Sequence, residues 1–297
     1  MLYDLSHPVN DVGPCTFATN DKRPRVSFEE GDSHGHLFIT SRIDNLYSNT
    51  ATHVDLPGHL VESARFGWPT VGQIPIDRFI GPCAILDFSH RCEALQDWFT
   101  DEGVFRRGRL ERFDEFLALG RGLGVSRLEL EGALKSVDAV IPDLKGVLLY
   151  SGLSRFWTNG VFESWEHAYF YAPFLMSDAI EFLIGEASAL TFVGIDAFQL
   201  EDPISNLRGD ELPLISNELS VIEAKRGVRT MVKAAVAHWR ERSVHQQLFE
   251  ASVVIYENLN VPAALANKCG TFSGPPLNLQ LESLNDNALV RPYFVVD

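Results

Sequence analysis

The sequence predicts an α/β fold. Short apolar runs rich in β-branched residues recur along the chain, and turns or charged residues bound each of them. Segments with helical spacing of apolar residues separate these runs, an alternation typical of α/β proteins. The expected strands are residues 84–88, 146–150, 190–195 and 253–256, and the expected helices are residues 110–119 and 177–184.

Near the N-terminus, residues 2–5 and 37–43 are predicted strands. The intervening residues 8–36 are rich in Pro, Asn, Asp and Gly, so we expect a loop that borders the substrate. Ser177 and Asp178 mark the start of the second helix, where a capping side chain and a negative charge are both favourable.

At the C-terminus, residues 272–281 and 290–296 are predicted to form a hairpin. Asp286 and Asn287 are expected near its tip, because both residue types favour turns. Neither internal repeats nor low-complexity linkers divide the chain, so we expect one domain over residues 1–297.

Composition narrows the functional classes. The chain has 297 residues, of which 45% are hydrophobic and 22% charged, enough to bury a large core. Its net charge of −15 argues against nucleic-acid binding, for which a basic face is the expected footprint. The N-terminus lacks a basic region followed by an apolar run, and no stretch has the roughly 18 apolar residues of a membrane helix. We therefore expect no membrane association and a cytoplasmic location.

The segment Asn49-Thr-Ala-Thr-His-Val-Asp-Leu-Pro-Gly-His59 is the most informative in the sequence. His53, Asp55 and His59 stand at odd positions, so an extended backbone would direct all three to one face. Imidazole and carboxylate are ligands for zinc or manganese at hydrolytic sites. Separate ordinary roles, such as a turn cap or a surface histidine, are the alternative that these residues alone leave open.

This segment resembles the signature His-x-Gly-Thr-His-x-Asp-x-Pro-x-His of the cyclase family of metal hydrolases, which includes bacterial kynurenine formamidases and isatin hydrolases. Thr52, His53, Asp55, Pro57 and His59 match the signature, whereas Asn49 and Ala51 replace its first histidine and its glycine. Residues 76–87, 146–157 and 192–196 resemble later family segments in the same order. His245 and Glu257 are spaced like the family's remaining metal histidine and bridging glutamate.

The resemblance implies a compact, single cyclase-like domain of the swivelling β/β/α type, built on a central mixed β-sheet. It also implies that His53, Asp55, His245 and Glu257 bind one or two divalent ions, zinc or manganese, and that His59 transfers protons. Asn49 leaves three outcomes open: a weak ligand of a two-ion site, a single ion held by the other residues, or a metal-free descendant of an enzyme.

Two further regions bear on the substrate. Phe156 and Trp157 follow an expected core strand and are candidate pocket residues, with core packing as the alternative. Residues 214–243 have a ragged helical stripe and form an insertion relative to the formamidases, expected to shape one wall of the pocket.

The resulting hypothesis is a metal-dependent amidohydrolase, arylformamidase-like or cyclase-like, that cleaves an amide, formamide or cyclic amide C–N bond with metal-activated water. A lactone hydrolase or a polyketide-type cyclase/dehydratase is the nearest alternative. A noncatalytic binding protein that has lost a full metal site is the second. The expected partners are a small-molecule substrate and other copies of the chain, because the resemblance implies a homodimer or homotetramer.

Overall fold

The structure is a computed structural model of the whole chain. It describes residues 1–9, 25–33, 36–44, 46, 48–59, 69, 71–92, 123–154, 173–197, 200, 243–277 and 287–296. The predicted helix at residues 110–119, the pocket residues Phe156 and Trp157, and almost all of the insertion at 214–243 lie outside these residues.

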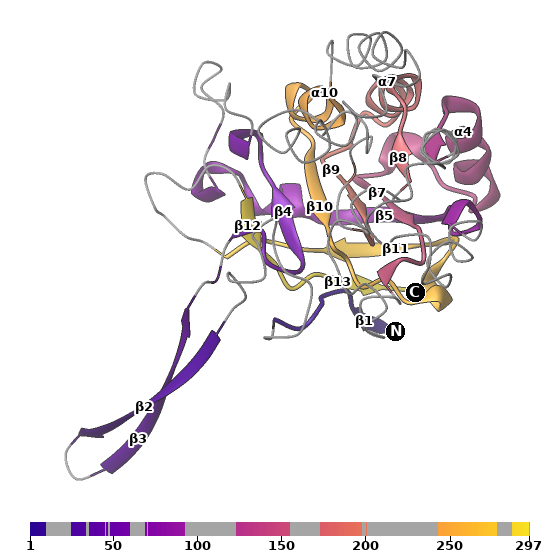
Figure 1. Cartoon of the computed structure of the whole chain (residues 1–297). Coiled ribbons are helices and arrows are strands. Elements are labelled where there is room, and N and C mark those ends of the chain that lie inside the picture. The colour runs from indigo at the N-terminus through magenta and orange to yellow at the C-terminus, as the bar shows by residue number, and fades with distance from the viewer. Residues whose placement is uncertain are drawn as a thin grey trace, which may run out of the picture.

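A nine-stranded mixed sheet organises the described residues (Figure 1). Its central strands β5, β7, β9 and β10 are parallel, and its outer pairings are antiparallel. The expected α/β class and central mixed sheet are therefore confirmed. In spatial order the strands are β1 (Leu2–Asp4), β13 (Tyr293–Val295), β11 (Lys268–Ser273), β5 (Ile80–Asp87), β7 (Gly146–Tyr150), β9 (Phe192–Ile195), β10 (Val254–Glu257), β4 (His53–Asp55) and β12 (Asn287–Leu289).

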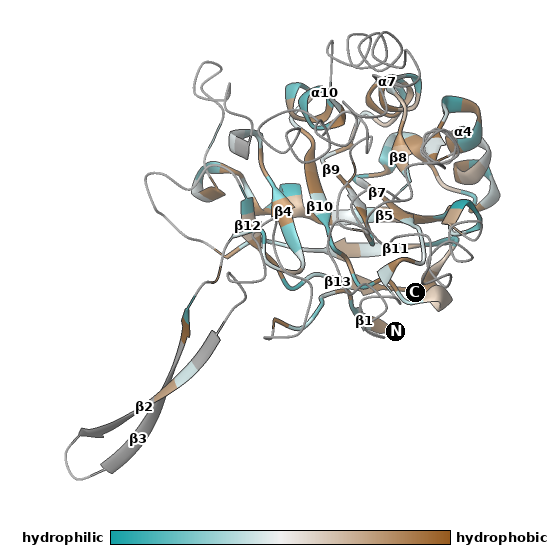
Figure 2. Ribbon diagram, in the orientation of Figure 1, coloured by the Kyte–Doolittle hydropathy of each residue, from teal (hydrophilic) through white to brown (hydrophobic). Residues whose placement is uncertain are grey.

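The central strands are the apolar runs that the sequence marks as strands. All residues of β7, β9 and β10 are buried, as expected for parallel strands covered on both faces. In Figure 2 β9 is largely brown and β10 is brown over its first part, whereas β4 is largely teal. Gly146 permits close strand packing, because a Cβ there would lie 1.7 Å from the Phe192 ring.

The three α-helices among the described residues gather on one side of the sheet (Figure 1), where they cover one apolar cluster. They are α4 (Arg127–Ser136), α7 (Ser177–Glu186) and α10 (Val244–Glu250). A second apolar cluster lies on the other face, between the central strands and β11 and β13. Short 3₁₀ helices complete the connections: η2 (Pro57–His59), η3 (Val71–Gln73), η4 (Ile76–Phe79), η6 (Ile141–Asp143) and η7 (Ala263–Leu265).

The described residues also form two small sheets outside the main one. Strands β6 (Gly124–Val125) and β8 (Phe174–Leu175) pair in parallel. Strands β2 (Arg25–Ser33) and β3 (His36–Asp44) form a hairpin that extends away from the body (Figure 1). The prediction of a strand at 37–43 is confirmed, but the loop predicted over 8–36 is wrong for residues 25–33, which pair along the whole of β3.

The predicted C-terminal hairpin is partly wrong. Strands β11 and β13 are antiparallel neighbours, so the two segments do meet. Asn287, however, belongs to β12, which pairs with β4 at the opposite edge of the sheet. Among the described helices, none is long and apolar enough to cross a membrane.

Candidate metal centre

Strands β4 and β10 present the candidate ligands on one face of the sheet. The two strands are antiparallel, with His53 opposite Glu257 and Asp55 opposite Ile255. Residues directly opposite each other in an antiparallel pair share a face, as do alternate residues of one strand. His53, Asp55 and Glu257 therefore project to the same side, which faces α10.

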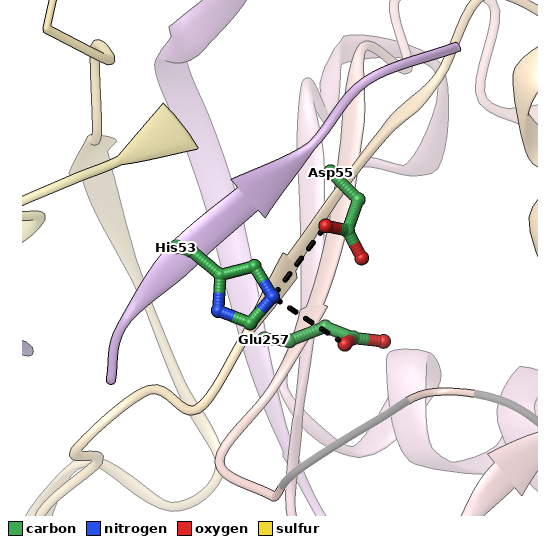
Figure 3. Close-up of side chains that lie close together, drawn as sticks. All are labelled: His53, Asp55 and Glu257. Atoms are coloured by element: carbon green, nitrogen blue, oxygen red, sulfur yellow. Dashed lines mark ion pairs between the residues drawn. The ribbon is translucent and has the colours of Figure 1, made fainter. Parts of the chain in front are cut away.

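These three side chains converge (Figure 3). The Nε2 atom of His53 lies 3.4 Å from Oδ1 of Asp55 and 3.7 Å from Oε2 of Glu257. One ligand atom from each residue lies within 4.8 Å of the other two, a spacing that suits a shared metal ion.

Helix α10 brings a second imidazole to the same place. Its first turn begins after Ser243, whose hydroxyl accepts a hydrogen bond from the Gln246 N–H at 3.1 Å, and it contacts both β10 and η2. Nε2 of His245 lies 3.3 Å from Oδ2 of Asp55 and 3.5 Å from Oε1 of Glu257. Each carboxylate thus presents one oxygen to His53 and the other to His245.

Neighbouring backbone groups orient the cluster. Nδ1 of His53 lies 2.9 Å from the Ala51 carbonyl oxygen. A carbonyl only accepts, so Nδ1 carries a proton, and Nε2 is the ring nitrogen available to a metal ion. Oε1 of Glu257 accepts a hydrogen bond of 2.9 Å from the Leu200 N–H.

The cluster is buried, and its donor set fits a divalent ion. His245, the most exposed of the four residues, is only 8% exposed. Removing two carboxylates from water costs free energy unless positive charge compensates them. Two imidazoles and two carboxylates form the nitrogen-and-oxygen set that binds Zn²⁺ or Mn²⁺, so the residues present fit the expected metal.

The structure describes the other predicted site residues only in part. Asn49 is half-buried in the turn at 48–50 that precedes β4. His59 is the last residue of η2, so the prediction that the backbone is extended from His53 to His59 is wrong at His59. The structure does not describe the side chain of His59. Phe156 and Trp157 also lie outside the described residues.

Asn287 lies at the site, although the sequence indicated a turn there. It pairs with Asp55 across β12 and β4, so the two side chains share the metal-side face. Asn287 is 2% exposed, and its Oδ1 accepts a hydrogen bond from the Ser48 hydroxyl, beside Asn49. No local pattern could reveal this, because the pairing joins segments more than two hundred residues apart.

Comparison with known families decides the assignment. The model of the Cyclase family, described as "Putative cyclase", matches residues 3–202, about two thirds of the sequence. The chain belongs to the Cyclase family. The match begins near the first strand and includes the segment with His53 and Asp55. A search of curated proteins finds no match.

Solved structures share the fold of this Cyclase family member. Isatin hydrolase A from Ralstonia solanacearum is 15% identical with a TM-score of 0.63, and the alignment covers 100% of this chain and 92% of that one. Isatin hydrolase A from Labrenzia aggregata, bound to benzyl benzoate, is 15% identical with a TM-score of 0.62 and coverages of 100% and 94%. A protein described as a potential metal-dependent hydrolase with cyclase activity is 20% identical with a TM-score of 0.54 and coverages of 99% and 96%. These likenesses establish the cyclase-like fold.

Proposed function

We propose that the protein is a metal-dependent hydrolase that cleaves the C–N bond of an amide, formamide or cyclic amide. The observation that carries this proposal is the convergence of His53, Asp55, His245 and Glu257 in one buried cluster. The names of the isatin hydrolases and of the metal-dependent hydrolase with a similar fold support it. A noncatalytic binding protein is the alternative, and the convergence of these four potential ligands argues against it.

Each residue has a role in the proposal. Asp55 and Glu257, which each lie close to both imidazoles, would bind the ion through their carboxylates. His53 and His245 would complete the coordination. A bound divalent ion lowers the pKa of water toward about 7 and polarises a carbonyl group. Hydrolysis adds water across the C–N bond, and His59 would deliver the proton that the leaving nitrogen needs.

The ion is proposed to be zinc or manganese, in one or two copies. Each carboxylate faces both histidines, an arrangement that suits two ions bridged by Asp55 and Glu257 as well as one ion at the centre. Asn49 would be a weak ligand in the two-ion case. Asn49→His then strengthens metal binding, whereas an unchanged affinity would place Asn49 away from the ion.

Metal content and turnover test the proposal together. The protein is stripped with a chelator and reconstituted with Zn²⁺ or Mn²⁺, and metal per chain is measured by elemental analysis. Turnover is then assayed on a panel of formamides, cyclic amides and lactones. We expect His53→Ala to abolish both binding and turnover, while His90→Ala, which changes an exposed histidine after β5, preserves both. Wild-type protein that binds no stoichiometric ion at neutral pH refutes the proposal.

A ring-closing or lactone-opening reaction is the second candidate. The family's name favours it, and so does the cyclase activity ascribed to one of the structurally similar hydrolases. The same panel separates the two reactions: preference for lactones over cyclic amides of equal ring size indicates an ester substrate. Linear precursors of the cyclic amides and lactones are assayed beside the panel, and their dehydration or ring closure indicates a cyclase.

We further propose that the protein forms a homodimer or homotetramer through the β2–β3 hairpin. An isolated two-stranded hairpin is marginally stable in water, and among the described strands β2 and β3 pair only with each other. On this hairpin Phe28 is 71% exposed and Ile43 is 47% exposed. Light scattering measures the mass of the protein particle in solution and hence the number of chains in it. Replacing residues 25–44 with a short Gly-Ser linker is expected to give monomers, and an unchanged mass would exclude the hairpin as the interface.

A further inference from the structure

Asp196 is a buried carboxylate outside the metal cluster. Asp196 directly follows β9, and Glu257 is the last residue of the parallel neighbour β10, so both lie at the C-terminal ends of these strands. Asp196 is completely buried. Its Oδ1 accepts the Ser151 N–H at 2.6 Å, and its Oδ2 accepts the Gly152 N–H at 2.9 Å and the Ser154 hydroxyl at 3.3 Å. One side chain therefore fixes the whole turn that follows β7.

Ala197 and Leu200, which follow Asp196 along the chain, both contact the segment at Glu257. The Ala197 carbonyl accepts the Asn258 N–H at 2.8 Å, directly after Glu257. The Leu200 N–H then donates to Oε1 of Glu257 at 2.9 Å. Asp196 thus lies between two attachments, one to the turn at 151–154 and one to a candidate metal ligand.

The chemistry at this position needs a carboxylate. The Ser151 and Gly152 N–H groups point at different oxygens, and both oxygens of a carboxylate accept. An asparagine would oppose one of these N–H groups with its own NH₂ group. Burial works against the charge and raises the pKa of Asp196 to about 6, while the Ser151, Gly152 and Ser154 hydrogen bonds act in the opposite direction.

We propose that Asp196 is a positioning residue of the metal site. It ties the turn at 151–154 to the end of β9, and through the Leu200 N–H, four residues further along the chain, it sets the orientation of the Glu257 carboxylate. The inference rests on the proposed function, because it assigns to Glu257 the role of metal ligand.

Metal affinity of matched variants tests the inference. The dissociation constant for Zn²⁺ is measured by competition with a chromogenic chelator, and the visible spectrum of the Co²⁺ form reports ligand geometry. We expect Asp196→Asn to weaken Zn²⁺ binding by about 10–100-fold, the range for loss of a partner that orients a ligand, and to alter the Co²⁺ spectrum. Asp87→Asn is the matched control, because Asp87 ends β5 and likewise accepts the Ser89 N–H at 2.9 Å and hydroxyl at 2.7 Å.

A milder variant covers the case in which Asp196→Asn does not fold. Ser154→Ala removes only the 3.3 Å hydrogen bond and is expected to weaken Zn²⁺ binding by a few-fold, with an unchanged urea midpoint. Wild-type affinity in Asp196→Asn, or equal losses in Asp196→Asn and Asp87→Asn, overturns the inference and leaves the proposed function standing. If Asp196→Asn fails to fold, wild-type affinity in Ser154→Ala overturns it. A wild-type protein that binds no Zn²⁺ overturns both.

Discussion

Neighbouring residues of β4 and β10 face two very different environments. His53, Asp55 and Glu257 point toward α10 and form the candidate metal centre. Val54 and Tyr256, which alternate with them, point to the other face and pack in its apolar cluster. The Tyr256 ring lies 5.7 Å from the Phe192 ring and 4.8 Å from the Phe272 ring. The alternation of a strand therefore separates chemistry from stability within a few residues.

The largest effect is expected from Glu257→Gln on the metal face. A neutral amide cannot supply the carboxylate charge that the proposed ion needs, so turnover should fall to the level of the metal-free protein. The free energy of unfolding of the metal-free form should change by no more than about 1 kcal/mol, because a costly buried charge is removed. Steady-state kinetics and urea denaturation measure the two quantities. Glu250→Gln on α10 is the control, and a large loss of stability in Glu257→Gln would contradict the separation.

The adjacent substitution Tyr256→Ala should show the opposite pattern. It removes a fully buried ring from the apolar face, so we expect the free energy of unfolding to fall by about 3–5 kcal/mol. The dissociation constant for Zn²⁺ should remain within a few-fold of wild type wherever the protein is still folded. If Zn²⁺ affinity falls in proportion to stability, the two faces are coupled and the comparison fails.

Two buried titratable groups outside the metal cluster should make the stability of the protein depend on pH. The first is His7. Its backbone N–H donates to Oγ1 of Thr52 at 2.8 Å, and burial lowers the pKa of its imidazole from 6.5 to about 4. The unfolded state binds the proton more readily, so stability from this group is present above pH 6.5 and lost as pH falls to about 4. The difference amounts to about 3 kcal/mol. His7→Gln should remove this loss, as urea titrations of both proteins between pH 4 and 7 would show.

The contribution of Asp196 to stability changes with pH in the opposite direction. Burial raises its pKa from 3.8 to about 6, so the folded state holds the proton more tightly. Its stabilising contribution is present below pH 3.8 and lost as pH rises through about 6, again by about 3 kcal/mol. In the wild type, the pH-dependent contributions of His7 and Asp196 to the free energy of unfolding nearly cancel. Asp196→Asn should therefore expose a stability that rises from pH 4 to 6.5, and a slope equal to that of wild type would show that Asp196 does not titrate in this range.

The sequence predicts the parts of this comparison unequally. The central strands are recognisable because each is a continuous apolar run, and residues 146–150 coincide with β7. Helix α4 was not predicted, although Ser126 and Glu129 have the spacing of a capping box and the Ser126 N–H and hydroxyl donate to the Glu129 carboxylate. With only Leu130 and Leu134 fully buried, its apolar stripe is weak.

The candidate site shows a similar limit. The spacing of His53 and Asp55 correctly predicts that they share a face, because β4 is extended over these residues. The convergence of Glu257 and His245 on them came only from the family resemblance. Nonlocal pairing decides such contacts, and Asn287 shows why they are missed: a residue that favours turns lies in a strand next to Asp55.

The smallest effect is expected from Tyr256→Phe, which isolates one hydrogen bond on the apolar face. The Tyr256 hydroxyl donates to the Gly274 carbonyl at 2.7 Å in a fully buried position. The substitution keeps the ring contacts with Phe192 and Phe272 and leaves that carbonyl without its donor, so a loss of about 1 kcal/mol is expected. Thermal and urea denaturation measure it, and Tyr293→Phe on the partly exposed β13 provides the control. Because Tyr256 adjoins Glu257 but faces away from it, Zn²⁺ affinity should not change; a change would mean that the apolar face also sets the geometry of the ligands.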